Sequence, residues 1–419
     1  MSFRAILFSV LITLAASFSH NLLAEIVTPE RSDAVTLTTV TDKVYQRNPA
    51  QHMDTAIQQQ VNANTDRANT LFADVSTVNL RHQNDVVGTS NGLQEWEANL
   101  EMPLWLPGQK QQQLALSDTM LAEIAAYKQA LRLQASGKVR ELIWNVALAE
   151  TATKQAWQAW QTAQQLESDV KTRVTAGELA NTELLLANTN VLEIRSKYLQ
   201  LAAELEHAIS SYTHITGQQF LPGNYEESLP ELAFKHHAEI VVNQQHPALM
   251  ILDQQITTLR AKQELAKFDG AVNPSVSVGI KRERGDLADG YDNSVGLGIT
   301  FALDDKVYRQ PAVAEAARAL ADAEIARKQL ERQLNITLFS ALHDLETKRQ
   351  LLELIAQKDA ATQKYVALQQ RSFELGETDL VSLLRSQELA NESHSRKQAL
   401  EIDIKHMIAS VNQAMGMLL

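Results

Sequence analysis

The sequence contains the same phrase twice, as "RVTAGELANTELLLAN" at 173–188 and "RSFELGETDLVSLLRSQ" at 371–387. In each phrase an arginine is followed four or five positions later by Gly-Glu, and then by a leucine-rich stretch. Glycine ends helices well because it adopts the left-handed conformation without steric cost. Each phrase therefore predicts the turn of a helical hairpin, with one helix ending at Gly177 or Gly376 and another following it.

The two phrases belong to a longer internal repeat. Pro49 and Pro247 are 198 positions apart, and Gly177 and Gly376 are 199 positions apart. A repeat of this length is too long for a solenoid unit and indicates a duplicated half. The expected divisions are an N-terminal segment at 25–41, a first repeat at 42–220, a linker at 221–237 and a second repeat at 238–419.

Each repeat contains two segments in which apolar and polar residues alternate, near 74–104 and 274–303. This alternation predicts two β-hairpins, either half-buried in a soluble sheet or set in an outer-membrane barrel with its apolar face outward. Four strands cannot close a barrel around a lumen, and open edges do not occur in lipid, so a barrel requires several chains. The residues that would face lipid are Trp96, Leu100, Met102, Val276, Val278, Ile280, Val295, Leu297, Ile299 and Phe301.

Between each hairpin and the following phrase lies a long stretch with almost no Gly or Pro, beginning at Pro107 and at Pro311. A continuous helix of such length would extend roughly 100 Å, although two consecutive helices also fit each stretch. In the second stretch the apolar residues recur at helical spacing and predict one buried stripe of a coiled coil. The stripe is Leu330, Leu334, Leu338, Ala341, Leu345 and Leu352.

The N-terminal residues 1–24 combine one arginine with an apolar run too short to span a bilayer, which is typical of a secretory signal peptide. The absence of cysteine excludes disulfides and thiolate metal sites. The net charge of −12 argues against nucleic-acid binding. No Walker loop, G-x-S-x-G, H-E-x-x-H or dinucleotide fingerprint is present, so we expect no enzyme activity, cofactor or metal site.

These features together resemble the TolC family of outer-membrane efflux proteins. The features are the signal peptide, the twofold repeat, one hairpin per repeat between long helices, and the R-x(3–4)-G-E phrase. The resemblance covers about residues 40–419. The stretch "MPLWLPGQKQQQLA" at 102–115 is similar to the cation-efflux branch of that family, which includes CzcC.

The resemblance implies a mainly α protein with a small β part. Long coiled-coil helices would form a trimeric α-barrel, and four strands per chain would contribute to a twelve-stranded outer-membrane β-barrel. The expected function is passive export across the periplasm and outer membrane of a Gram-negative-type envelope, with metal cations as the suggested cargo. The expected partners are a homotrimer, a periplasmic adaptor, an inner-membrane pump and outer-membrane lipid. The alternative is a soluble periplasmic coiled-coil structural or adaptor protein.

The resemblance also implies that the two Gly-Glu turns are periplasmic tips that contact the adaptor, whereas helix capping alone is the competing role. The tip residues are Arg173, Gly177, Glu178, Arg371, Gly376 and Glu377. The two glutamates are expected in the first turn of the next helix, where negative charge is favoured. Candidate aperture charges are Glu183, Asp379 and Arg385. The best-known family member has acidic residues where this chain has Ser382 and Arg385.

Overall fold

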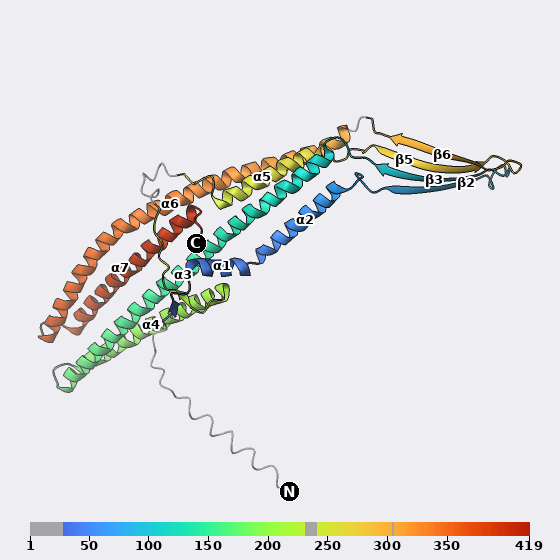
Figure 1. Cartoon of the computed structure of the whole chain (residues 1–419). Coiled ribbons are helices and arrows are strands. Elements are labelled where there is room, and N and C mark those ends of the chain that lie inside the picture. The colour runs from blue at the N-terminus through green and yellow to red at the C-terminus, as the bar shows by residue number, and fades with distance from the viewer. Residues whose placement is uncertain (1–27, 231–240, 304–305) are drawn as a thin grey trace, which may run out of the picture. The chain divides into compact units, whose positions relative to one another are not determined.

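The computed structural model describes residues 28–230, 241–303 and 306–419 (Figure 1). The predicted signal peptide lies outside the described residues, as does the second part of the predicted linker. The chain forms two compact units. Unit 1 comprises residues up to 36, 141–225 and 347–406, and unit 2 comprises 37–140, 226–346 and 407–419. Each unit therefore takes segments from both predicted repeats.

One order of elements occurs twice along the chain: a helix, two strands, a very long helix and a second long helix. The elements are β1 (Arg31–Ser32), α1 (Leu37–Arg47), η1 (Pro49–Gln51), α2 (His52–Asn69), β2 (Thr77–Asn84), β3 (Gln94–Pro103), α3 (Gln109–Thr175), α4 (Asn181–Thr216), β4 (Leu221–Pro222), α5 (Pro247–Ala266), β5 (Ser275–Arg284), β6 (Asp292–Thr300), α6 (Lys306–Glu374) and α7 (Leu380–Ala414). The expected fold class, mainly α with a small β part, is confirmed.

Each predicted long stretch is a single helix, of 67 residues in α3 and 69 in α6. The alternative of two consecutive helices is therefore wrong. The expected start of the second helix also needs correction, because α6 begins at Lys306 and Pro311 lies within its second turn. At that position proline removes only one helical hydrogen bond, the bond to the carbonyl of residue 307. All six residues of the predicted stripe are buried or half-buried.

Unit 2 contains a four-stranded antiparallel sheet in the order β2-β3-β5-β6 (Figure 1). Beside it lie α2, α5 and the parts of α3 and α6 that belong to this unit. Of these, α2, α3 and α5 form a small apolar core in which Val61, Leu116 and Met120 are buried. Leu265 at the end of α5 packs on the same core. The helices of unit 2 are thus joined by apolar contacts, while the sheet carries no such core on its exposed face.

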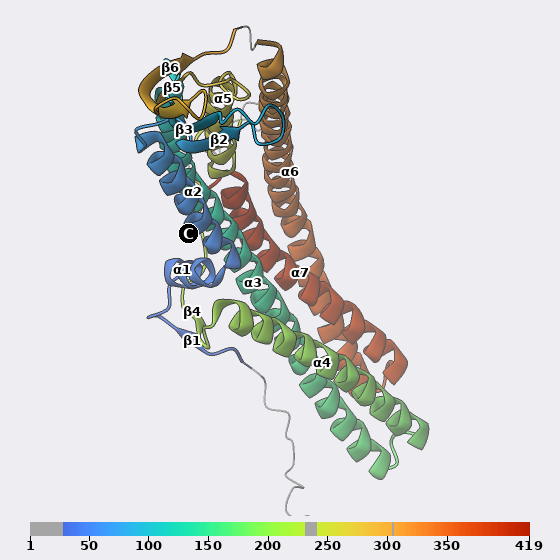
Figure 2. The ribbon, with the colours of Figure 1, turned by 90° about the vertical axis from the view of Figure 1, so that its right-hand side faces the viewer.

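Unit 1 contains two helical hairpins. Figure 2 shows α4 alongside the second part of α3, and α7 alongside α6. Near the two turns these helices share one apolar core, which contains Leu166, Val170, Ala187, Phe373, Leu380 and Leu383. The short parallel pair β1–β4 also belongs to this unit. The core holds the two turns of the repeated phrase in one compact body.

Among the described residues, no helix is long and apolar enough to cross a membrane.

Candidate functional site

The apolar residues of the sheet lie in rows that cross all four strands. Two complete rows are Val78–Leu100–Val278–Leu297 and Leu80–Ala98–Ile280–Val295. Leu80 is 79% exposed and Leu297 is 81% exposed, so these side chains are not covered by other described residues. We call this the apolar face. Nine of the ten residues selected from the sequence lie on it, and the tenth, Phe301, directly follows the end of β6. The sequence prediction missed Val78 and Leu80, because the alternation in β2 is interrupted by polar residues.

The opposite face of the sheet is polar in every row. Its two rows nearest the hairpin loops are Arg81–Glu97–Lys281–Ser294 and Gln83–Glu95–Glu283–Asp292. Lys281 forms ion pairs with Glu95 (3.1 Å) and Glu283 (2.7 Å). Glycine is required where this face is crowded, since a Cβ at Gly279 would lie 1.7 Å from Oδ1 of Asn99. The two faces thus differ in polarity over the half of the sheet nearer the helices, while toward the hairpin loops the apolar face also carries His82, Arg282 and Asn293.

The sheet has two edges that pair with nothing in the described chain. β2 pairs only with β3, and β6 pairs only with β5. Because all neighbours are antiparallel and the number of strands is even, β2 and β6 run in opposite directions. A second copy can therefore place its β2 beside β6 and continue the antiparallel pattern without a break.

The two Gly-Glu turns have the same backbone structure. Gly177 (φ +79°) and Gly376 (φ +76°) are left-handed, as predicted. The Glu178 N–H donates to the Arg173 carbonyl (2.9 Å), and the Gly177 N–H donates to the Val174 carbonyl (3.0 Å). This pair of hydrogen bonds is a Schellman motif, which caps the carbonyl end of the preceding helix. The second turn has the same two hydrogen bonds, from Glu377 to Ser372 (2.8 Å) and from Gly376 to Phe373 (3.1 Å).

The expected position of the two glutamates is wrong. Glu178 and Glu377 do not lie in the first turn of the next helix, because α4 begins at Asn181 and α7 begins at Leu380. Their backbone N–H groups cap the preceding helix instead, and the chain needs further residues before a new helix can start. Sequence reasoning found the glycine that ends each helix but placed the following helix too early.

The arginines of the two phrases have different surroundings. Arg173 is 24% exposed; its Nη1 donates to the carbonyl of Phe373 (3.0 Å) and its guanidinium lies 4.9 Å from the Phe373 ring centre. Its Nε also pairs with Glu178 (3.1 Å). Arg371 is 69% exposed, and its one ion pair within the described residues is with Glu374 on its own helix (3.1 Å). Only the first arginine therefore joins α3 to α6.

The three candidate aperture charges do not form one cluster. Glu183 lies half-buried in the first turn of α4. Asp379 caps α7, because its Oδ1 accepts the Ser382 N–H (2.7 Å). Hydrogen bonds from the Ser382 side chain and backbone hold the pKa of Asp379 below its usual value. Arg385 is exposed on α7. No ion pair joins any two of the three within the described chain.

No group of three or more His, Asp or Glu side chains in the described residues is arranged to hold a metal ion.

Known proteins resemble this chain in structure but not recognisably in sequence. No family model matches it, and no curated protein matches it. The solved outer-membrane channel OprN is 16% identical, with a TM-score of 0.71 over 93% of this chain and 95% of that chain. The CmeC outer-membrane channel of Campylobacter jejuni is 14% identical, with a TM-score of 0.67 over 91% of this chain and 85% of that chain.

A third solved structure is the open state of the MtrE outer-membrane channel of Neisseria gonorrhoeae. It is 14% identical, with a TM-score of 0.66 over 91% of this chain and 89% of that chain. Likeness of this extent at such low identity shows a shared fold. The chain therefore has the TolC-like fold expected from the sequence.

Proposed function

We propose that the protein is the outer-membrane channel of a tripartite efflux system, a passive conduit across the periplasm and outer membrane. One observation carries this proposal: the four-stranded sheet has an exposed apolar face and a wholly polar opposite face. Apolar-out and polar-in alternation is the pattern of outer-membrane strands, whose outer face meets lipid and whose inner face meets water. The shared fold with solved outer-membrane channels supports the same conclusion.

Three chains together would supply twelve strands. The free edges of β2 and β6 support this assembly, because an unpaired edge is not tolerated in lipid and each edge can pair with the opposite edge of another copy. The ten selected residues, from Trp96 to Phe301, would then face lipid. The polar rows would line the lumen of the barrel.

Metal cations are the proposed cargo. The polar face contains five carboxylates, Glu95, Glu97, Glu101, Glu283 and Asp292, against the two cations Arg81 and Lys281. A lumen lined with excess negative charge raises the local concentration of cations and lowers that of anions. The resemblance of residues 102–115 to the cation-efflux branch points to the same cargo.

A periplasmic adaptor and an inner-membrane pump are the proposed partners. The six tip residues would contact the adaptor, and Glu183, Asp379 and Arg385 would set the charge near the aperture. The exposed fractions of Glu178 (59%) and Arg371 (69%) support an accessible tip. A pump is needed because the sequence carries no nucleotide-binding fingerprint of its own.

Disulfide trapping between strands tests the proposal against a clean background, because the natural chain has no cysteine. We would combine Gly296→Cys in β6 with a cysteine at each polar-face position of β2 in turn (Thr77, Asn79, Arg81 and Gln83), because closure of a barrel staggers the register between neighbouring copies. Membranes would be separated before the oxidised protein is analysed under denaturing conditions. The expected result is a covalent three-chain species in the outer-membrane fraction.

Single-cysteine variants are the matched controls, because one cysteine can join at most two chains. A soluble monomer or dimer in the periplasm would overturn the proposal and support a soluble coiled-coil protein. An outer-membrane protein that forms at most two-chain species with every double variant of the series would overturn the trimeric arrangement.

A further inference from the structure

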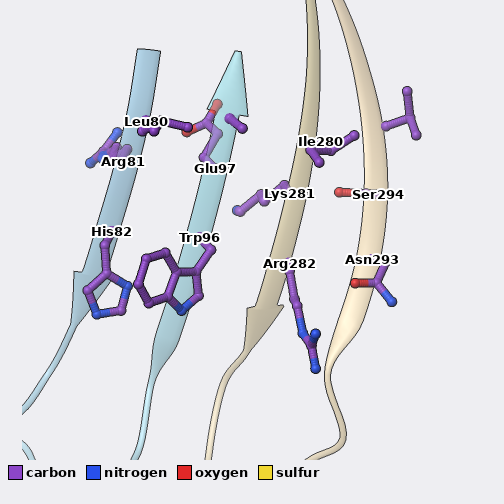
Figure 3. A pocket seen from close by; sticks show the side chains of 12 residues that line it. Leu80, Arg81, His82, Trp96, Glu97, Ile280, Lys281, Arg282, Asn293 and Ser294 are labelled. Atoms are coloured by element: carbon purple, nitrogen blue, oxygen red, sulfur yellow. The ribbon is translucent and has the colours of Figure 1, made fainter. Parts of the chain in front are cut away.

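The apolar face is not flat. A hollow of about 570 Å³ lies between the strands toward their hairpin ends, and Figure 3 shows the side chains around it. Its lining includes Leu80, Trp96, Ala98, Ile280, Arg282 and Val295. The hollow lies on the surface that would face lipid, on the side of the sheet opposite to the lumen.

The hollow exists because one row contains a small residue. Ala98 lies between Leu80 and Ile280 in the register of the sheet, and its methyl group leaves space between the two larger side chains. In the next row Trp96 stacks on His82 with ring centres 3.9 Å apart (Figure 3). Its indole is thereby held toward β2, and the space over Ala98 remains open. Apolar walls of this kind suit a hydrocarbon chain.

The rim of the hollow carries positive charge that is not neutralised. Arg282 lines the hollow, is exposed on the apolar face and lies 4.3 Å from the ring centre of Tyr291. Arg284, one row nearer the loops and outside the lining, lies 5.0 Å from the same ring, and its Nε donates to the Gly92 carbonyl (3.2 Å). Neither arginine has an ion-pair partner within the described residues. The neighbouring Lys281 provides the contrast, because it is on the polar face and pairs with two glutamates.

Two guanidinium groups beside one ring repel each other unless an anion lies between them. Four carboxylates, Glu95, Glu283, Asp289 and Asp292, line a second hollow together with Arg284, whereas the only carboxylate that lines the hollow of Arg282 is Glu97, whose side chain belongs to the polar face. No ion pair joins a carboxylate of the described residues to Arg282. A charged side chain that faces lipid is also costly unless it reaches the headgroup region. An anionic headgroup beside Arg282 and Arg284 resolves both difficulties, since arginine binds phosphate through paired hydrogen bonds.

We propose that this hollow binds a phosphate-bearing lipid of the outer leaflet. One acyl chain would lie over Ala98 between Leu80 and Ile280, and the phosphate would contact Arg282 and Arg284. The aromatic rings of Trp96 and Tyr291 would lie at the boundary between chain and headgroup, where such rings are common. The inference rests on the proposed function, because it requires the apolar face to meet the outer membrane.

The test uses the full mature protein purified from the outer membrane in a non-ionic detergent. Native mass spectrometry would measure binding of phosphatidic acid and of phosphatidylcholine with the same acyl chains. We expect phosphatidic acid to bind more tightly. Arg282→Gln should weaken the binding of phosphatidic acid roughly tenfold, which is the effect expected from the loss of a charge-assisted hydrogen bond. The binding of phosphatidylcholine should be unchanged. Ala98→Leu, which fills the hollow, should weaken the binding of both lipids.

Arg81→Gln is the matched control, because Arg81 also borders the hollow but its side chain belongs to the polar face of the same sheet. It removes the same charge and should leave the binding of both lipids unchanged. Equal affinity of the natural protein for the two lipids, or equal losses in Arg81→Gln and Arg282→Gln, would overturn the lipid site alone. Failure to recover the natural protein from the outer membrane would instead overturn the proposed function.

Discussion

The two tip turns share a backbone and differ in almost every side-chain contact. Each turn has a left-handed glycine, with φ of +79° at Gly177 and +76° at Gly376, and each has both hydrogen bonds of the Schellman motif. Yet Arg173 is 24% exposed and bound to the neighbouring hairpin, whereas Arg371 is 69% exposed and bound only to its own helix. The repeated phrase therefore specifies a turn and leaves the role of its arginine open.

One residue of spacing explains the difference between the arginines. Arg173 precedes its glycine by four positions and Arg371 by five, so the two side chains leave their helices about 100° apart. The helices that follow the turns differ in burial, and here the second hairpin is the more buried one. Leu380 and Leu383 of α7 are 1% and 0% exposed, whereas the equivalent Asn181 of α4 is exposed. Both hairpins contribute to the shared apolar core, but the first adds the arginine bridge and the second adds two fully buried leucines at the start of its second helix.

The largest effect is expected from removing a leucine of the second hairpin. Leu383→Ala should lower the free energy of opening at the tip of unit 1 by about 2–5 kcal/mol, because a buried leucine leaves a cavity. The matched change is Leu184→Ala, at the equivalent place in α4. Leu184 is half-buried, so its truncation should cost clearly less. Hydrogen exchange at the amides of α7 and α4 measures both costs, and equal values would contradict the assignment of the core to the second hairpin.

The next effect is expected at the arginines. Arg173→Ala removes the hydrogen bond to the Phe373 carbonyl (3.0 Å) and the contact with the Phe373 ring, and should lower the free energy of tip opening by about 1–3 kcal/mol. Arg371→Ala should change it by about 0.5 kcal/mol or less, since an exposed ion pair contributes little. Exchange rates at the ends of α3 and α6 distinguish the two variants.

A further variant separates charge from geometry at the first arginine. Arg173→Lys keeps the positive charge but loses the planar group that lies against the Phe373 ring while donating to its carbonyl. We expect Arg173→Lys to lower the free energy of tip opening by less than Arg173→Ala does. A cost as small as that of Arg371→Ala would mean that the positive charge, and not the planar guanidinium group, accounts for the contribution of Arg173.

The glycines test the part that the turns have in common. Gly177→Ala and Gly376→Ala should each cost about 1 kcal/mol, because alanine adopts the left-handed conformation with strain. No atom lies within 4 Å of the added Cβ at either position, so the cost comes from the backbone alone. Thermal or chemical unfolding of the two variants should therefore give matching losses. Unequal losses would show that the surroundings, and not only the turn, select glycine.

Much of this fold was predictable because local patterns carry it. The alternation in 94–103 and 275–284 fixed which side chains share a face, and the near absence of Gly and Pro indicated the long helices. The position of Glu178 was predicted wrongly because a glycine at the end of a helix permits more than one path for the backbone that follows it. Whether the glutamate caps the old helix or enters the new one depends on the two residues that separate it from the next helix.

Other features depend on contacts between distant parts of the sequence. The link from Arg173 to Phe373 spans 200 positions, and no local pattern indicates which arginine of the pair faces the other hairpin. The hollow over Ala98 depends on the register that places this residue beside Ile280. That register is set between two hairpins from different repeats, so alternation within one strand cannot reveal it.

The smallest effect is expected from acid, and it should appear at only one of the two turns. Asp379 caps α7, and its hydrogen bonds from Ser382 hold its pKa below the usual 3.8. The equivalent residue before α4 is Ala180, which has no side chain to accept a hydrogen bond. A group with a lowered pKa in the folded state stabilises that state fully above its unfolded pKa, and this contribution is lost as the pH falls through the folded value.

Below about pH 4, after correction for intrinsic exchange, the first turn of α7 should therefore lose protection from hydrogen exchange while the first turn of α4 does not. Asp379→Ser keeps a capping oxygen without a titrating group, and should abolish the pH dependence while preserving most of the protection. The same acid transition in Asp379→Ser would show that another group controls the end of α7.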